Sequence, residues 1–382
     1  MDFRLNETQE MFRDMVRNFA RKEVAPLTQE LDKKAEFPWK NYKQAAELGI
    51  LAMTLPEEFG GVEADSISYA LAIEELAWAS ASVADSIMLV EALTYLLHTY
   101  GTREQQQKWI PPLVNAEILG SFAVTEPNAG TDAASMQTTA VLDGDCYVLN
   151  GTKAFINNAP VADMAIVFAV TDKEKGPRGG ITAFIVEKGM PGLSAGKPED
   201  LLGQRSLIVG ELIMEDVRVP KENVLGKVGE GFKMAMKCLD NGRIAIAALA
   251  LGIAQAALDE SIKHSKQRVQ FGQPIANFQA TQFKIANMAT EIEAARLLIH
   301  KAAFLKDQGV KFSKEAAMAK LFASDLAVRA ANEAVQIHGG YGYTKDYVVE
   351  RLYRDCKITQ IYEGTNEIQR VVIARHVYNE SE

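Results

Sequence analysis

A β-hairpin is indicated by Val141-Leu142-Asp143-Gly144-Asp145-Cys146-Tyr147-Val148-Leu149, in a chain whose two ends look helical. Two strand-like runs flank an Asp-Gly pair, a strong short-range hairpin signal. Asn150-Gly151 directly afterwards predicts another turn. Further strand-like runs follow at residues 165–170, 181–186, 212–214 and 217–219. Because the connections between them are too short for crossover helices, we expect an antiparallel β domain.

Helical patterns lie on both sides of this β region. Asn6 and Gln9 form a potential helix-capping pair, and apolar residues then recur at helical spacing as far as Pro26. Residues 70–81 and 88–100 are further candidate helices, and long helical patterns run from about Gly231 to Val377. The order α, β, α lacks the alternation of a Rossmann domain. The predicted class is α+β: an N-terminal all-α domain (1–118), a middle antiparallel β domain (119–230) and a C-terminal α-helical bundle (231–382).

Composition excludes several classes of protein. The 382 residues carry a net charge of −9, which argues against nucleic acid or an anionic membrane surface as the main partner. The three cysteines form no CxxC pair and the five histidines no HExxH motif, so we predict neither disulfides nor a metal site. No apolar run reaches the length of about 18 residues that spans a membrane, and residues 1–20 do not resemble a signal or transit peptide. We expect a cytoplasmic, bacterial protein.

A candidate general base lies in Ile361-Tyr362-Glu363-Gly364-Thr365-Asn366-Glu367-Ile368-Gln369-Arg370. Glu363 precedes a glycine at a break in a helical region, where a carboxylate can approach a ligand and Gly364 lets the backbone come close. The alternative is an ordinary solvated glutamate in a turn. The whole run resembles the base-bearing segment of the acyl-CoA dehydrogenases, flavoenzymes that desaturate acyl-CoA thioesters.

Two segments of the β region resemble the flavin-binding parts of that family. Thr125-Glu126-Pro127-Asn128-Ala129-Gly130-Thr131-Asp132 is a turn whose main-chain donors can hold a flavin edge or a phosphate. In Phe155-Ile156-Asn157 the resemblance implies an aromatic residue over the flavin ring. Asn157 stands where the family usually has a threonine near flavin N5, and an amide differs from a hydroxyl in length and geometry.

Three segments of the C-terminal region extend the resemblance. Asp240-Asn241-Gly242-Arg243 places an acid and a base on one helix face, by resemblance near the acyl-CoA. Some branched-chain members carry the catalytic glutamate just before this arginine, where this chain has Gly242. Arg268-Val269-Gln270-Phe271-Gly272, followed by Gln279, suits a pyrophosphate and an adenine. In Gln336-Ile337-His338-Gly339-Gly340-Tyr341-Gly342 the paired glycines admit a dinucleotide, and we interpret His338 as a packing residue.

The resembling segments span the chain from Leu5 to His376, and they look most like the bacterial short-chain (butyryl) branch. The resemblance implies FAD contacts from Phe122, Val124, Thr125, Gly130, Thr131, Phe155, Ile156, Asn157, Arg268, Phe271, Gln279, Gln336, Gly339, Gly340, Thr365 and Glu367. It implies substrate contacts from Thr131, Asp240, Arg243, Gly364 and Glu91.

By resemblance, Glu363 removes the α proton of an acyl-CoA while the β hydride passes to FAD, and an electron-transferring flavoprotein takes the electrons. A homotetramer, a dimer of dimers, is expected because the segments around Arg268 and Gly339 reach the FAD of a neighbouring subunit in the family. The alternatives are an enoyl-CoA reductase, an oxidase, a dehydrogenase of cyclic or functionalised acyl-CoA, and a non-catalytic DNA-associated relative. An intact Glu363 and the acidic balance argue against the last.

Glu91 lies in the apolar run Leu89-Val90-Glu91-Ala92-Leu93, and its role stays open. In the first interpretation its carboxylate points to solvent. In the second it borders the acyl tail and selects a polar or cyclic substrate, or acts as a second base.

Overall fold

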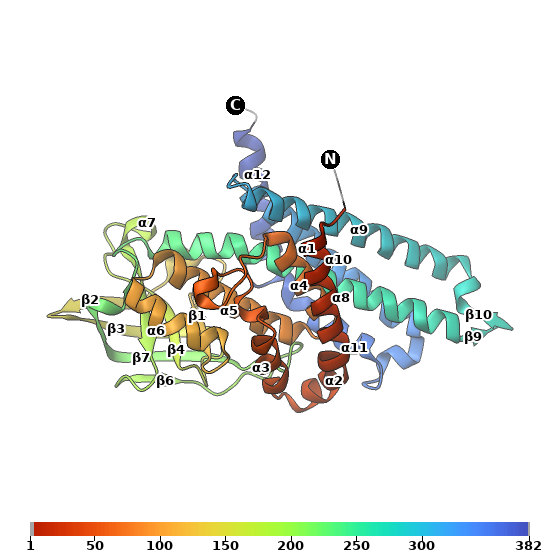
Figure 1. Cartoon of the computed structure of the whole chain (residues 1–382), viewed down its shortest axis with the longest axis horizontal. Coiled ribbons are helices and arrows are strands. Elements are labelled where there is room, and N and C mark those ends of the chain that lie inside the picture. The colour runs from red at the N-terminus through yellow and green to blue at the C-terminus, as the bar shows by residue number, and fades with distance from the viewer. Residues whose placement is uncertain (1–3, 381–382) are drawn as a thin grey trace.

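The computed structural model describes residues 4–380 and has three consecutive blocks, helical, β and helical (Figure 1). The N-terminal block contains α1 (Glu7–Phe19), a π-helical turn (Ala20–Val24), α2 (Ala25–Lys34), α3 (Trp39–Glu47), α4 (Ser66–Ala79), α5 (Ala81–Tyr100) and α6 (Arg103–Val114), with 3-10 turns at Ile50–Ala52 and Glu57–Phe59. The predicted capping box is present at α1, since the Asn6 and Gln9 side chains each accept from the other's backbone N–H.

The middle block is a twisted sheet. Its strands are β1 (Gly120–Ala123), β2 (Thr139–Asp143), β3 (Cys146–Asn157), β4 (Met164–Val170), β5 (Ile181–Glu187), β6 (Leu193–Ala195), β7 (Val209–Pro220) and β8 (Val224–Leu225), with the short α7 (Pro177–Gly180) and 3-10 turns at Ala133–Ser135 and Lys221–Asn223. The order is β6-β7-β3-β2-β4-β5-β8, with β1 beside β4. The Asp-Gly hairpin is present, because Asp143 of β2 faces Cys146 of β3.

Two predictions about this sheet are corrected. The sheet is mixed, because β1 pairs with β4 in parallel. The chain between these strands contains the β2–β3 hairpin, so the parallel crossover is made by strands and loops and needs no helix. Asn150 and Gly151 form no turn between strands. They lie inside β3 at a register shift, where Gly151 has φ +148° and a Cβ would meet Thr138 at 2.5 Å, so the pair marks a bulge.

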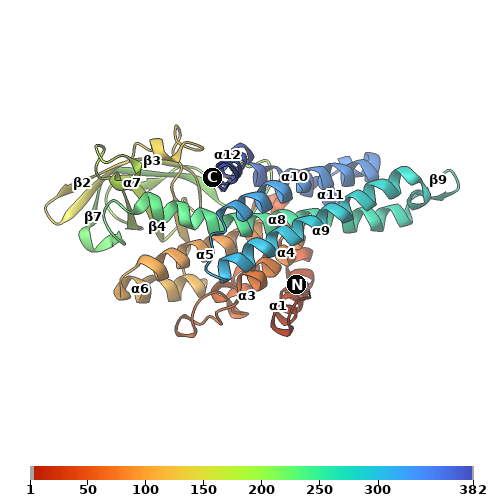
Figure 2. The same cartoon turned by 90° about the horizontal axis from the view of Figure 1, so that it is seen from above.

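The C-terminal block is a bundle of long helices. It contains α8 (Gly231–Gln267), the hairpin β9 (Val269–Gln270) and β10 (Gln273–Pro274), α9 (Gln279–Asp307), α10 (Ser313–His338), α11 (Val348–Asp355) and α12 (Asn366–Asn379), with 3-10 turns at Ile275–Asn277, Gly339–Tyr343 and Lys357–Gln360. The β9–β10 hairpin projects at the end of the molecule opposite the sheet (Figures 1 and 2).

Helix α8 joins the blocks because it is apolar on all sides. It packs against α4, α9 and α10, and every residue from Ile244 to Ala254 is buried. Gly252 permits a close approach to α4, since a Cβ there would lie 2.3 Å from the Glu74 carbonyl oxygen. Both α5 and α8 have windows long and apolar enough to cross a membrane, but 78% and 83% of those windows are buried inside the protein. Both helices are therefore core helices of the protein.

Candidate active site

A cavity of about 350 Å³ lies where the three blocks meet. Helix α5, the loop after β1, the end of β3, the start of α8 and the segment before α12 all contribute to its wall. The predicted residues that line it are Glu91, Phe122, Val124, Thr125, Gly130, Thr131, Phe155, Ile156, Asn157, Arg243, Glu363 and Gly364. Residues from distant parts of the sequence are thus brought to one place.

Glu363 presents its carboxylate to this cavity. Its backbone has φ +55°, in the left-handed region, which non-glycine residues seldom adopt. The Oε2 atom is shut off from solvent and has no hydrogen-bond partner among the described residues. Burial raises the pKa of Glu363 to about 8, with Arg243 and Lys320 opposing the rise and Asp85 and Glu91 adding to it. A carboxylate with a raised pKa is a stronger base than an ordinary one.

The segment that carries Glu363 is held by two buried side chains that sequence reasoning missed. Lys320 of α10 is fully buried, and its Nζ donates to the Gly364 carbonyl at 2.9 Å and to Asn366 Oδ1 at 2.9 Å. Gln369 Nε2 donates to the same carbonyl at 2.7 Å. Burial lowers the pKa of Lys320 to about 8. The sequence did offer one signal for Lys320, which is a lysine in an alanine-rich, apolar run of residues.

Gly242 of α8 lies directly against the Glu363 carboxylate. A Cβ at position 242 would stand 2.6 Å from Glu363 Oε2 and 2.9 Å from its Cδ, closer than carbon atoms approach. The carboxylate therefore occupies space that only a glycine leaves open. A residue other than glycine at position 242 would clash with the carboxylate of Glu363 in its observed position.

Arg243 and Asp240 form an ion pair on α8, as the sequence predicts for their spacing. Ser313 Oγ donates to the second Asp240 oxygen at 2.6 Å. Arg243 lines the cavity and its Nε has no partner in residues 4–380, whereas Asp240 does not line the cavity. Asp240 thus orients Arg243.

Asn157 is held by a carboxylate that the sequence did not single out. Its Nδ2 donates to Asp85 Oδ1 of α5 at 2.9 Å, and both residues line the cavity. Burial raises the pKa of Asp85 to about 6, and the nearby Tyr362 hydroxyl and the Asn157 amide counteract part of the rise. The asparagine is therefore fixed in orientation by an acid on the opposite wall.

The loop that follows β1 is anchored by a buried ion pair, also missed. Lys153 of β3 is fully buried, and its Nζ donates to Glu126 Oε1 at 2.8 Å and to the Val124 carbonyl at 3.1 Å. Glu126 also accepts from the backbone N–H groups of Gln137 and Thr138. Beside this loop, Phe155 is 69% exposed at φ +57° and offers a flat aromatic face to the cavity.

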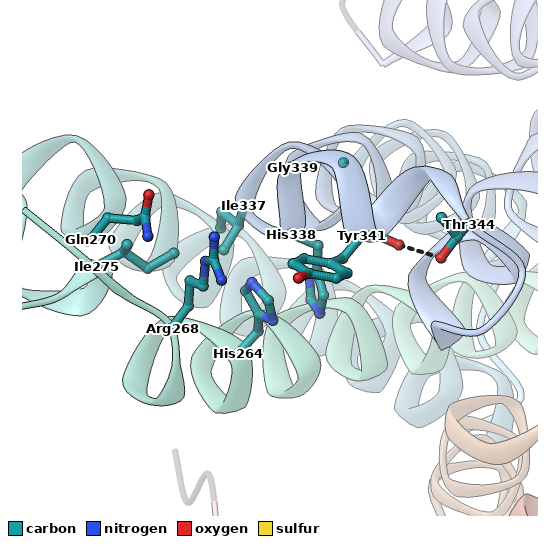
Figure 3. A pocket seen from close by; sticks show the side chains of 10 residues that line it. His264, Arg268, Gln270, Ile275, Ile337, His338, Gly339, Tyr341 and Thr344 are labelled. Atoms are coloured by element: carbon teal, nitrogen blue, oxygen red, sulfur yellow. Dashed lines mark hydrogen bonds between the residues drawn. The ribbon is translucent and has the colours of Figure 1, made fainter.

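A second pocket, of about 520 Å³, lies at the other end of the bundle (Figure 3). Arg268, Gly339 and Gly340 line it, and the Arg268 guanidinium stands 5.4 Å from the centre of the Tyr341 ring. Arg268 forms no ion pair with any residue the structure describes. A Cβ at Gly339 or Gly340 would meet nothing within 4 Å, so the backbone is open to a ligand. His338 is buried, bonded to the Ala334 carbonyl and stacked on His264, in keeping with a packing role.

Several predicted residues line neither pocket. Phe271 is 94% exposed on the β9–β10 hairpin. Thr365 caps α12 by accepting from the Ile368 N–H. The remaining ones are Asp240, Gln279, Gln336 and Glu367. One protomer thus brings the residues around Glu363 together and leaves the set around Arg268 in a separate place.

Comparison with known proteins identifies the family. Family models of the acyl-CoA dehydrogenase N-terminal, middle and C-terminal domains match residues 6–117, 121–217 and 229–378. The probable acyl-CoA dehydrogenase YngJ of Bacillus subtilis is 51% identical over 99% of this chain and 100% of its own. An acryloyl-CoA reductase (NADH) of Anaerotignum propionicum is 48% identical over 99% of this chain and 96% of its own.

The fold agrees with this match. The structure of butyryl-CoA dehydrogenase from Megasphaera elsdenii superimposes with a TM-score of 0.95 at 48% identity, covering 99% of this chain and 100% of that one. The predicted three-block fold and the predicted family are both confirmed. The chain is a member of the acyl-CoA dehydrogenase family.

Proposed function

We propose that this enzyme desaturates an acyl-CoA thioester between its α and β carbons, with FAD as cofactor and Glu363 as the general base. One observation carries the proposal: the unpartnered carboxylate of Glu363, with its raised pKa, faces a cavity walled by the loop 125–131 and by Phe155. A base in a water-poor site needs a matched pKa and an open lone pair to accept a carbon-bound proton.

The described residues fit FAD. The loop 125–131 offers main-chain donors, and the exposed ring of Phe155 suits the face of a flavin. When bound, FAD accepts the β hydride. Phe122, Val124, Thr125, Gly130, Thr131, Ile156 and Asn157 would hold the ring in the cavity, with Thr365 and Glu367 near its edge.

The chain's own groups account for the proton transfer. Lys320 and Gln369 hold the Glu363–Gly364 turn in place, so the carboxylate is positioned before substrate arrives. Arg243, Gly364 and Thr131 would contact the acyl-CoA. The α proton of a thioester is weakly acidic, so the enolate-like oxygen needs a donor, for which we propose the backbone N–H of Glu363.

Glu363→Gln tests the base. The amide keeps the shape of the side chain but cannot accept the proton, so kcat should fall by about a hundredfold or more while FAD and acyl-CoA binding persist. The measurement is the rate of flavin bleaching by substrate in a stopped-flow instrument, with the exposed Glu47→Gln as the matched control. Bleaching at the parental rate in Glu363→Gln would assign the base to another carboxylate.

A second candidate is reduction of an enoyl-CoA by the same groups in the reverse direction, with protonated Glu363 as the acid. The similarity to an acryloyl-CoA reductase favours it. Anaerobic assays with acyl-CoA and a dye acceptor, and with enoyl-CoA and a reductant, compare the two directions. A separate aerobic assay with acyl-CoA and no dye tests for an oxidase, which would consume oxygen.

We further propose a homotetramer in the cytoplasm that passes electrons to an electron-transferring flavoprotein. Supporting features are the unpaired Arg268 beside the open glycines and the exposed Phe271 at a projecting tip. In the dimer of dimers, Arg268, Phe271, Gln279, Gln336, Gly339 and Gly340 would contact the FAD held in the main cavity of a neighbouring subunit.

A further inference from the structure

Asp85 is a buried acid in the cavity wall that the proton transfer does not use. It lies on α5, it is 5% exposed, and it forms no ion pair within residues 4–380. Its Oδ1 accepts a hydrogen bond from Asn157 Nδ2 at 2.9 Å, and its Oδ2 has no partner among the described residues. Burying a carboxylate without a cation is costly. A costly group whose hydrogen bond goes to another residue of the cavity wall points to a role in the site.

The backbone of Asn157 is held independently of Asp85. Asn157 is the last residue of β3 and pairs with Val209 of β7. Its carbonyl oxygen accepts from Ser121 Oγ of β1 at 2.8 Å. Two neighbouring strands therefore fix the main chain, and the side-chain amide is the part that Asp85 orients.

The carboxylate determines which end of this amide points away from α5. An ionised carboxylate only accepts hydrogen bonds, whereas an amide has a donor end and an acceptor end. Burial raises the pKa of Asp85 to about 6, so the group is ionised above neutral pH. The amide nitrogen of Asn157 must then point to Asp85, which leaves its Oδ1 at the other end. No described residue donates to that oxygen, so Asn157 carries a free acceptor in the cavity wall.

We propose that Asp85 is a positioning residue of the flavin site, which keeps the amide oxygen of Asn157 turned toward the FAD. This inference rests on the proposed function, which has FAD bound in the same cavity. The β hydride that the substrate gives up converts a ring nitrogen of the flavin from an acceptor into an N–H donor. A fixed acceptor beside the ring satisfies the reduced flavin and leaves the oxidised flavin without a donor. Through Asn157, Asp85 therefore favours the reduced form.

Asp85→Asn removes this constraint. An amide at position 85 can donate as well as accept, so Asn157 can turn either end toward the flavin and serve both oxidation states. The oxidised form gains a donor, which lowers the midpoint potential. The same substitution removes a negative charge, which raises the potential whether or not Asn157 is present. Repeating Asp85→Asn in an Asn157→Ala background leaves the charge effect alone, so the difference between the two backgrounds isolates the positioning effect.

The measurement is an anaerobic reductive titration of the substrate-free, FAD-loaded enzyme at about pH 7.5 against a dye of known potential. We expect Asp85→Asn to shift the equilibrium toward oxidised FAD by about tenfold or more, relative to its shift in the Asn157→Ala background. For a two-electron couple this is about 30 mV. Glu91→Gln is the matched control. Glu91, whose orientation the sequence left open, lines the same cavity from α5 and makes no hydrogen bond with Asn157, so its effect should be equal in both backgrounds.

The outcomes separate this inference from the proposed function. Equal shifts for Asp85→Asn in the two backgrounds, or a relative shift toward reduced FAD, overturn the inference and leave the proposed function standing. If Asp85→Asn does not retain FAD, Asp85→Ser takes its place in the same comparison, because a hydroxyl also donates and accepts. Bleaching of the parent enzyme by acyl-CoA tests the proposed reaction separately. A parent chain that cannot bind FAD at all overturns both.

Discussion

Glu363 must be ionised to accept a proton, yet its surroundings disfavour the ionised form. Burial raises its pKa to about 8 from the ordinary 4.5. If the carboxylate is the base, kcat/KM should rise about tenfold per pH unit below pH 8 and level off above it. A pH profile of kcat/KM measures this limb. If kcat/KM instead levels off near pH 4.5, the base in the free enzyme has an ordinary pKa.

The same residue should make stability depend on pH. Because the folded pKa lies above the unfolded one, the contribution of Glu363 to stability is fully present below about pH 4.5 and is lost as the pH rises through 8. Glu363→Gln has no charge to bury. We expect its melting temperature to exceed that of the parent by a few degrees at pH 9 and by less at pH 5. Equal shifts at both pH values would contradict this.

Sequence reasoning located the side chains proposed to act on the substrate better than the side chains that hold them in place. Glu363, Arg243 and Asn157 were predicted because the segments that carry them resemble the family, and the structure brings all three to one cavity. Asp85 was missed. It is a polar residue in the apolar helix α5, and its role depends on Asn157, which lies far away in the sequence.

The helix α10 determines where the base segment lies. Lys320 donates to Gly364 and Asn366, which begin the turn into α12. Lys320→Met keeps the length of the side chain and removes both hydrogen bonds, so the turn should loosen and kcat should fall about tenfold or more with FAD retained. Steady-state kinetics on the FAD-saturated variant measure the loss. The exposed Lys301→Met of α9 is the control, and equal kcat values for the two variants would remove Lys320 from this role.

Elements formed by near neighbours were predictable, and those formed by distant partners were not. The capping box at Asn6 and the Asp-Gly hairpin depend on residues within a few positions of each other. The parallel pairing of β1 with β4 joins Gly120 to Met164, and nothing local specifies it. Asn150-Gly151 has the composition of a turn, but the ladder to β7 continues past it on both sides, so tertiary pairing overrides the local preference.

At the scale of the whole molecule, the two pockets are far apart in one chain, and assembly would join them. Arg268→Ala should weaken FAD retention by on the order of 1.5–3 kcal/mol, because a charge-assisted contact to the pyrophosphate is lost. FAD content after dialysis and the mass of the assembly by light scattering are the readouts. Arg218→Ala, an exposed arginine of the sheet, is the control. A colourless monomer with full activity would contradict the proposed assembly.

The division into three blocks was predictable because the period of the apolar pattern changes near residues 120 and 230. The distance between the cavity around Glu363 and the pocket around Arg268 was not predictable, because it depends on how the folded helices are arranged. Phe271, exposed at the tip of a hairpin, is an unfavourable feature in one protomer, and in the proposed assembly another copy would cover it.

The tight contact between Gly242 and Glu363 limits the mutational paths open to this enzyme. Any side chain introduced at 242 displaces the existing carboxylate, even one as small as alanine. A lineage that acquired a glutamate at 242 first would crowd the old base, and one that lost Glu363 first would pass through an inactive ancestor. A side chain at 242 and the present conformation of Glu363 therefore cannot coexist, so any substitution there requires the Glu363 carboxylate to move. Gly242 thus keeps open the space that the Glu363 carboxylate fills.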